Sequence, residues 1–396
     1  MQIGLVGKPS AGKSTFFAAA TLMDVAIAAY PFTTIEPNKG IGFVRVECID
    51  KELNTQCNPR SGLCHDHIRY VPIELIDVAG LVPGASQGKG MGNQFLDDLR
   101  QADVLIHVVD ASGSTNEKGE IVAPGTHDPL KDVEFLEEEL NTWFYQIIQK
   151  NLKKIARMTY ESKAKMIEAM SQGLSGIGVT QRQVARAADY CKLGEKKLVD
   201  WTDEDYKNFS KKIREESKPI IIAANKADKP QALENIKRIK EIYPDKIIIG
   251  CSAISELTLR KAARDGSLEY YSGNKDFKAL KELSEQQKQG LDYIKLNVLA
   301  KLDGTGVQKI LDYAVFNVLQ YKAIFPAGTK NLADQYGNVL PDCFLMPPEA
   351  TALDFAFKLH SDIGNGFIKA IDVKTRQLIG KDTILKNRDA VEIFHK

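Results

Sequence analysis

The chain has 396 residues, 43% of them hydrophobic and 27% charged, and its 53 Lys and Arg nearly balance its 52 Asp and Glu. This composition excludes a wholly disordered chain, and no apolar run reaches the roughly 18 residues of a membrane-spanning helix. The net charge of +1 argues neither for nor against a nucleic-acid partner. Six cysteines, in a chain whose start lacks a basic and apolar leader, predict a reduced, cytoplasmic protein with no membrane partner.

Five short segments predict the strands of a doubly wound α/β fold. They are continuously apolar or rich in β-branched residues, as buried parallel strands are. Helical segments lie between them, which is the pattern of an α/β protein. In chain order, the predicted strands are residues 2–6, 72–76, 104–109, 219–224 and 246–250.

The first strand leads into residues 7–14, which match the P-loop pattern G-x-x-x-x-G-K-[ST]. A helix-like segment, 16–23, follows, and its positive N-terminal end would point at a bound anion. Gly12 lets backbone amides approach phosphate oxygens. Lys13 would reach the β- and γ-phosphates, and Ser14 would bind Mg²⁺ through its hydroxyl.

A group of metal-ligating residue types precedes the second strand. Cys57, Cys64, His65 and His67 lie close together, and Cys48 is a further candidate ligand. The spacing C-x6-C-H-x-H is not that of a standard zinc motif. A loop with ordinary thiols is therefore the preferred interpretation, with metal binding as the alternative.

The second strand ends at Asp77-Val78-Ala79-Gly80. An aspartate at this position can hold Mg²⁺ through a water molecule, as the Walker-B aspartate does. The Gly80 amide could then contact the γ-phosphate. The position of this motif, after the P-loop in the sequence, predicts a nucleoside triphosphatase.

The 108 residues between Asp110 and Pro219 are far more than a β-α-β crossover needs. Apolar residues at three- and four-residue steps from Leu130 to Ile147 predict an amphipathic helix. Thr180 and Thr202 have the sequence context of helix N-caps, and residues 173–178 read as a hairpin loop. The predicted domains are a P-loop domain (1–126 and 217–319), an inserted helical hairpin (127–216) and a small C-terminal α+β domain (320–396).

The insertion is mildly basic. Residues 150–218 contain 16 Lys and Arg against 10 Asp and Glu, an excess of six positive charges. Such a surface could follow an RNA backbone. It is equally typical of a solvated helical face, and the residues alone leave both readings open.

The fourth strand is followed by Asn225-Lys226-Ala227-Asp228, and the fifth by Cys251-Ser252-Ala253. A carboxylate at Asp228 can accept hydrogen bonds from the guanine N1–H and exocyclic amine, whereas adenine would leave it unpaired. A backbone amide near Ser252 and Ala253 could meet guanine O6. Together with the P-loop and Asp77, these motifs predict a GTPase.

These motifs and their neighbours resemble the Obg branch of the translation-factor GTPases, specifically the YchF/Drg-like group. Residues 30–40 (YPFTTIEPNKG) resemble the first switch of that family, and residues 77–96 resemble its glycine-rich second switch. The C-terminal stretch resembles a TGS domain, which is a β-grasp-like fold. It contains Phe325-Pro326-x-Gly328, Leu340-Pro341, Ala350-Thr351-x-x-Asp354-Phe355-Ala356 and Val391-Glu392-Ile393.

The resemblance implies a Ras-like domain, a Mg²⁺ cofactor and slow GTP hydrolysis by water. Thr34 would be the switch I ligand of Mg²⁺, with Thr33 as the competing choice, beside Ser14 and Asp77. Lys13, Thr34 and Gly80 would act in hydrolysis. The remaining nucleotide-binding residues would be Lys8, Pro9, Ser10, Ala11, Gly12, Ser14, Thr15, Asn225, Lys226, Asp228, Ser252 and Ala253.

Three positions qualify what the resemblance implies. Leu81 stands where Ras-like GTPases carry a water-orienting glutamine, which predicts slow intrinsic hydrolysis or a catalytic group from Gln87, Asn93 or a partner. Ser10 stands where potassium-activated relatives often carry asparagine, which disfavours activation by potassium. The YchF branch often lacks a standard N-K-x-D motif and prefers ATP, but Asn225 to Asp228 are intact here and predict GTP.

Two functions follow from the sequence. The first is a GTP-controlled switch that binds the ribosome or structured RNA through residues 127–216 and the TGS domain. The second is a nucleotide sensor or NTPase that regulates protein partners without RNA. Nothing in the sequence indicates specificity for DNA.

Overall fold

The computed structural model describes residues 1–21, 38–78, 98–156, 162–194 and 196–396. The chain divides into two compact units. The first comprises residues 1–19, 37–40 and 75–307, and the second residues 20–36, 41–74 and 308–396. Among the described helices, none is both long and apolar enough to cross a membrane.

The first unit is built on a parallel sheet. Strands β1 (Gln2–Val6), β5 (Val104–Asp110), β6 (Ile220–Asn225) and β7 (Ile247–Gly250) pair side by side in that order. The end of β4 (Ile68–Asp77) lies beside β1, where the Val78 N–H donates to Leu5 O at 3.1 Å. Every residue of β5 is buried, because both faces of the sheet are covered.

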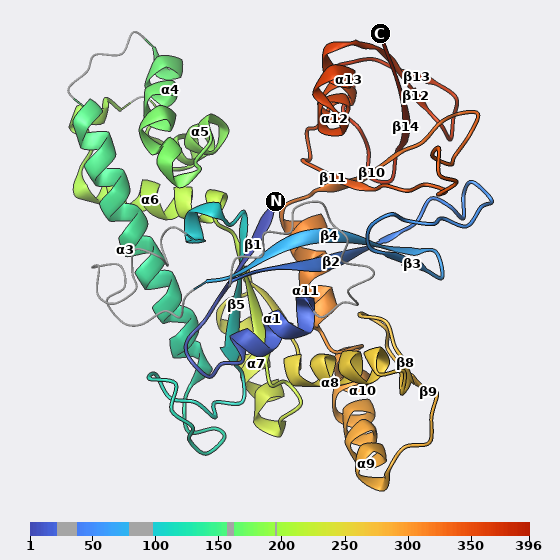
Figure 1. Cartoon of the computed structure of the whole chain (residues 1–396). Helices are drawn as coiled ribbons and strands as arrows, with labels where there is room; N and C mark the ends of the chain where they lie inside the picture. The colour runs from blue at the N-terminus through green and yellow to red at the C-terminus, as the bar shows by residue number, and fades with distance from the viewer. Residues whose placement is uncertain (22–37, 79–97, 157–161, 195) are drawn as a thin grey trace. The chain divides into compact units, whose positions relative to one another are not determined.

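Helices of the predicted doubly wound fold connect these strands (Figure 1). Helix α1 (Lys13–Thr21) follows β1, α7 (Pro230–Ile242) follows β6 and α8 (Ala253–Arg264) follows β7. All five predicted strands form, although β4 begins earlier than expected, at Ile68. The α/β fold class is therefore confirmed.

The insertion is helical, as predicted, but it contains more than one hairpin. Its helices are α3 (Pro129–Ile155), α4 (Lys163–Leu174), α5 (Gln181–Tyr190) and α6 (Asp203–Ser217). Both predicted N-caps form: the hydroxyls of Thr180 and Thr202 each accept a hydrogen bond from the third residue of the helix. A short 3-10 turn, η2 (Ser175–Ile177), ending at Gly178 with φ +73°, joins α4 to α5.

One hydrophobic core runs from the sheet into the insertion. Val6 and Leu105 of the sheet belong to the same buried cluster as Phe144 of α3 and Phe209 of α6. Burial of each such side chain stabilises the fold by about 1.5–3 kcal/mol. The insertion is thus packed continuously onto the sheet that precedes and follows it in the sequence.

The first unit continues after α8 with elements that the sequence analysis did not assign. These are β8 (Leu268–Glu269), β9 (Lys278–Ala279), α9 (Glu285–Ile294), the π-helix η4 (Lys295–Leu299) and α10 (Ala300–Leu302). Their apolar side chains form a small core with Leu259 of α8.

The second unit contains the C-terminal domain. Its sheet has the order β11 (Phe344–Met346), β10 (Lys322–Pro326), β14 (Ala390–His395), β12 (Phe367–Asp372) and β13 (Leu378–Ile379). The central pair, β10 and β14, is parallel, and the other pairs are antiparallel. Helix α12 (Ala352–Leu359) packs Phe355 into the core of this sheet and is followed by α13 (Ser361–Asn365).

The same unit holds α11 (Val307–Tyr313) from Gln308 on, the π-helix η5 (Ala314–Val318) and a hairpin-like extension. The extension consists of β2 (Lys39–Glu47) from Ile41 on, β3 (Leu63–His65) and β4 as far as Glu74. Strand β3 pairs with β4 in antiparallel fashion.

A buried histidine gives the fold a testable pH dependence. Burial of His107 in β5, together with the charges of Lys8 and Lys246, lowers the pKa of its imidazole from 6.5 to about 3. Between pH 6.5 and about pH 3, the folded chain therefore keeps this ring neutral, whereas the unfolded chain protonates it. The stability that His107 contributes is therefore complete above pH 6.5 and declines as the pH falls through 6.5 toward 3.

We expect the free energy of unfolding to fall by about 2 kcal/mol between pH 7 and pH 5 through His107 alone. His107→Gln should remove this part of the pH dependence, whereas His360→Gln at an exposed position should not. Urea unfolding at both pH values measures the difference. An unchanged pH dependence in His107→Gln would show that the ring is accessible to protons in the folded chain.

Candidate nucleotide-binding site

The P-loop lies between β1 and α1, in a conformation that depends on its small residues. Gly12 has φ +97°, and a Cβ there would lie 2.2 Å from Asn225 Nδ2. Ser10 has φ +62° and is exposed together with Pro9, whereas Ala11 is fully buried. The first amides of α1 have no acceptor within the helix. This end of the helix therefore suits an anion.

Lys13, at the start of α1, forms an ion pair and hydrogen bond with Asp77 at the end of β4. The Asp77 N–H donates to Asn38 O at 2.7 Å, which fixes the backbone at this point. Ser14 is exposed on α1 and Thr15 is half-buried beside it. The Ser14 hydroxyl and Asp77 carboxylate are hard oxygen donors, the kind that Mg²⁺ prefers, so these residues fit the ion.

Most of the two predicted switch segments, residues 30–37 and 79–96, lies outside the described part of the chain. Thr33, Thr34, Gly80, Leu81, Gln87 and Asn93 lie outside the described residues. The expected roles of Thr34 and Gly80 remain predictions.

Asn225 joins the two loops of the site. Its Nδ2 donates to Ala11 O in the P-loop at 3.0 Å, and its Oδ1 accepts the Ala253 N–H at 3.0 Å. The residue ends β6 and is buried. One amide side chain thus holds the P-loop at a set distance from the loop between β7 and α8.

Asp228 is positioned by Ser252, a contact that the sequence analysis did not predict. Its Oδ1 accepts from Ser252 Oγ at 3.0 Å, and Ser252 is fully buried. The other carboxylate oxygen lies 3.3 Å from both Tyr293 Oη and Lys229 Nζ. Sequence reasoning missed Tyr293, because it comes from α9, far along the chain, and no motif marks it.

Lys226 has a different environment from its neighbours in the motif. It has φ +59°, and its Nζ lies 2.9 Å from Asp110 Oδ2. Burial would raise the pKa of the Asp110 carboxyl, but hydrogen bonds from Lys226, Ser112 and Ser114 hold it below its ordinary value. Lys226 therefore supports the loop that follows β5.

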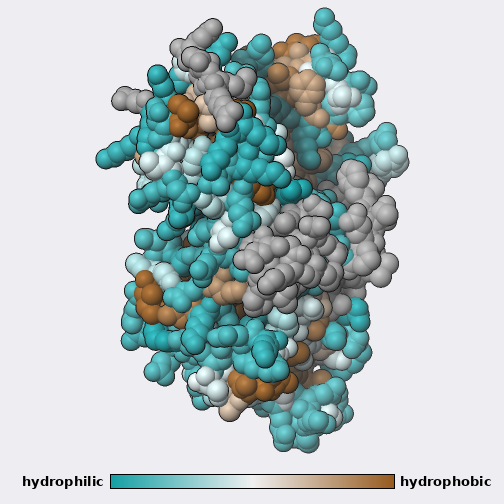
Figure 2. Space-filling view, turned by 90° about the vertical axis from the view of Figure 1, so that its left-hand side faces the viewer, coloured by the Kyte–Doolittle hydropathy of each residue, from teal (hydrophilic) through white to brown (hydrophobic). Residues whose placement is uncertain are grey.

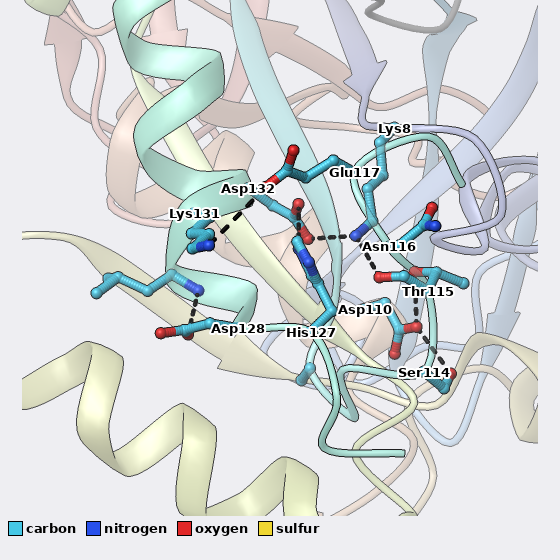
Figure 3. Close-up of polar contacts among 12 residues, drawn as sticks. Lys8, Asp110, Ser114, Thr115, Asn116, Glu117, His127, Asp128, Lys131 and Asp132 are labelled. Carbon is cyan, nitrogen blue, oxygen red and sulfur yellow. Dashed lines mark hydrogen bonds and ion pairs between the residues drawn. The ribbon is translucent and has the colours of Figure 1, made fainter. Parts of the chain in front are cut away.

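Lys8 connects the P-loop to the insertion. Its Nζ lies 2.8 Å from Asp132 Oδ2 in the first turn of α3 and donates to Thr115 O at 2.7 Å (Figure 3). The other Asp132 oxygen lies 2.8 Å from His127 Nε2. Lys8, Asp132 and His127 are all buried. The sequence analysis named Lys8 only as a nucleotide-binding residue and missed this contact, whose partners lie more than a hundred positions away.

Breaking the buried Lys8–Asp132 pair should destabilise the folded chain. Lys8→Met leaves the Asp132 charge buried with one partner fewer and should lower the free energy of unfolding by about 3–5 kcal/mol. Lys8→Met combined with Asp132→Leu should recover a large part of that loss, because no unpaired charge remains. Urea unfolding of the two single variants and the double variant measures the coupling.

The matched control is Lys237→Met on α7, whose exposed pair with Glu241 at 4.0 Å should contribute about 0–1 kcal/mol. A strictly additive result for Lys8 and Asp132 would contradict a direct interaction.

Comparison with protein families gives three matches along the chain. Residues 2–131 match the model described as 50S ribosome-binding GTPase. Residues 223–328 match the G4 motif-containing domain of Obg-like GTPase YGR210-like, and residues 336–395 match the TGS domain.

Whole-chain relatives agree with these matches. The GTP-binding protein MJ1332 of Methanocaldococcus jannaschii is 45% identical, over 99% of this chain and 98% of its own length. The ribosome-binding ATPase YchF of Mycoplasma genitalium is 29% identical over 97% of this chain and 91% of its own. The crystal structure of a GTP-binding protein from Pyrococcus horikoshii OT3 covers 100% of both chains at 36% identity, with a TM-score of 0.76.

Proposed function

The chain belongs to the Obg-like, YchF-related family of GTP-binding proteins with a TGS domain, and we propose that it is a GTP-controlled switch on the ribosome or RNA. In this proposal it hydrolyses GTP slowly with Mg²⁺. The observation that supports a switch most directly is the Lys8–Asp132 pair, because it joins the phosphate-binding loop to the insertion.

The proposed phosphate chemistry uses Lys13, Ser14 and Asp77. Lys13 would exchange its contact with Asp77 for the β- and γ-phosphates, which carry more negative charge. Asp77 would then be available to hold a water ligand of Mg²⁺, while Ser14 binds the ion directly. The ion would neutralise charge on the phosphates during attack by water.

The proposed choice of base depends on Asp228. Its carboxylate is held by Ser252 at a fixed orientation, so it can accept from the two N–H groups that guanine presents. The M. genitalium relative is named an ATPase, so base preference is the first property to test.

The proposed RNA contact is a hollow of about 310 Å³ beside α3, lined by Arg100, Lys150 and Lys154. The two lysines lie near the C-terminal end of α3, and Asp132 lies in its first turn. A helix of 27 residues spans about 40 Å. A shift of Lys8 on loss of the γ-phosphate would thus reach the hollow through one rigid helix.

Ion pairs on the insertion favour the second candidate, a sensor with protein partners. Lys163 lies 2.6 Å from Asp189, and Arg186 lies 3.6 Å from Glu216, so part of the positive charge is balanced locally. The face shown in Figure 2 is mostly hydrophilic, with small separated hydrophobic areas, as a solvated surface is. Two experiments test the proposal, and the second of them separates the two candidates.

The first experiment tests the base. Asp228→Asn should lower GTP affinity on the order of 10⁴-fold and create affinity for xanthosine triphosphate, whose C2 carbonyl accepts from the new amide. Lys13→Ala should weaken the binding of all nucleoside triphosphates, because it removes a phosphate contact. Equilibrium titration with labelled GTP, ATP and XTP measures each. Unchanged GTP binding in Asp228→Asn, or a wild-type preference for ATP, would refute guanine recognition.

The second experiment is ribosome co-sedimentation at fixed salt with a non-hydrolysable GTP analogue, with GDP and without nucleotide. We expect the analogue alone to drive pelleting, because the switch closes only on the γ-phosphate. Lys150→Ala with Lys154→Ala should weaken pelleting and reduce the dependence of log affinity on log salt by about two.

The control pair, Lys207→Ala with Lys211→Ala, removes the same charge from exposed positions of α6 and should leave pelleting unchanged. Equal pelleting in all three nucleotide states would exclude the ribosome switch and favour the sensor.

A further inference from the structure

Three cysteines and one aspartate converge in the second unit, on the segment between β2 and β4. The Sγ atoms of Cys48, Cys57 and Cys64 and a carboxylate oxygen of Asp50 all lie within 4.8 Å of one another. The Sγ atoms of Cys48 and Cys57 are 3.5 Å apart, and Cys64 Sγ is 3.7 Å from Asp50 Oδ2. Around a tetrahedral Zn²⁺ with Zn–S bonds of about 2.3 Å, ligand atoms lie roughly 3.5–3.8 Å apart.

We propose that Cys48, Asp50, Cys57 and Cys64 form a structural zinc site. The set provides three sulfur donors and one oxygen donor, a combination that suits Zn²⁺ and excludes the oxygen-binding ions Mg²⁺ and Ca²⁺. Four protein ligands close the coordination sphere, as in structural rather than catalytic zinc sites. This inference is independent of the proposed switch function.

Burial supports a bound cation. Cys48, Asp50 and Cys57 are 1%, 0% and 5% exposed. A carboxylate in such surroundings is costly unless a positive charge lies near it. Zinc binds cysteine in the thiolate form, so the ion would also offset the negative charge of the buried sulfur ligands.

Neighbouring groups hold the ligands in place. His67 Nδ1 lies 2.9 Å from Asp50 Oδ1, and the Cys57 N–H donates to Asp50 Oδ2 at 3.1 Å. The guanidinium of Arg69 lies 3.6 Å from Cys57 Sγ. Hydrogen bonds of this kind orient the ligands of metal sites. His65 is not part of the cluster: it lies 3.3 Å from Asp66.

The site lies where the β2–β4 segment meets the C-terminal domain within the same unit. The Asn58 N–H donates to Val339 O at 2.8 Å, and the Arg60 N–H donates to Pro341 O at 3.0 Å. Buried Arg69 donates to Leu340 O at 3.0 Å and to Pro341 O at 2.8 Å. An ion bound by Cys57 and Cys64 would fix both ends of the segment that makes these contacts.

The first test is the metal content of the untagged full chain, purified under reducing conditions. We expect one zinc per chain by elemental analysis. Cys57→Ser should lose it, and Cys191→Ser, a control thiol on the insertion, should keep it. Two results would overturn the proposal. One is wild-type protein that contains no zinc and also fails to bind cobalt, and the other is Cys57→Ser protein that retains all of its zinc.

Because Cys57→Ser could fail to fold, the second test uses wild-type protein. After a chelator has removed the native metal, added Co²⁺ should bind in its place. It should produce thiolate-to-cobalt charge-transfer bands and the visible bands of a tetrahedral cobalt site. His67→Ala should weaken Co²⁺ binding about 10–100-fold, and His360→Ala, at an exposed position, should not change it. A Cys48–Cys57 disulfide, detected by alkylation before reduction, would also overturn the proposal.

Discussion

The nucleotide site depends on one buried amide. Both polar atoms of the Asn225 side chain form hydrogen bonds with backbone groups of two different loops: Nδ2 donates to Ala11 O, and Oδ1 accepts from the Ala253 N–H. Each partner would cost about 1–3 kcal/mol if left unpaired in the interior. Because Gly12 is the residue against which Asn225 packs, any side chain at position 12 would disturb this bridge. The P-loop and the loop between β7 and α8 therefore share one fixed point.

A second constraint is the pairing of buried charges around the loop after β5. Asp110 is surrounded by hydroxyls and Lys226, and Asp132 by Lys8 and His127. Both aspartates are buried, and a buried carboxylate is costly unless such partners are in place. The consequence is that residues of the P-loop, the guanine motif and α3 belong to one network. A change in any of these residues would therefore alter the contacts of the others, as the proposed switch requires.

The two units use polar residues in different ways. In the first, buried polar groups hold loops whose positions are needed for nucleotide chemistry. In the second, buried Arg69 joins the strand extension to Leu340 and Pro341 of the C-terminal domain and also contacts Cys57 of the cysteine cluster. The segment 48–67 contains little regular structure beyond β3. Its conformation therefore depends on side-chain contacts, and a bound ion is an efficient way to supply them.

Sequence alone was sufficient for features that are local along the chain. The P-loop, the strands β1 and β5, the N-caps at Thr180 and Thr202 and the order of the GTPase motifs all follow from residues within a few positions of one another, because loop shape and capping depend on neighbouring backbone. Only the tertiary structure decided what distant residues do. The Lys8–Asp132 pair, Tyr293 beside Asp228, the number of helices in the insertion and the meeting of Cys48, Cys57 and Cys64 are set by how separate elements pack, and no spacing along the sequence encodes those distances.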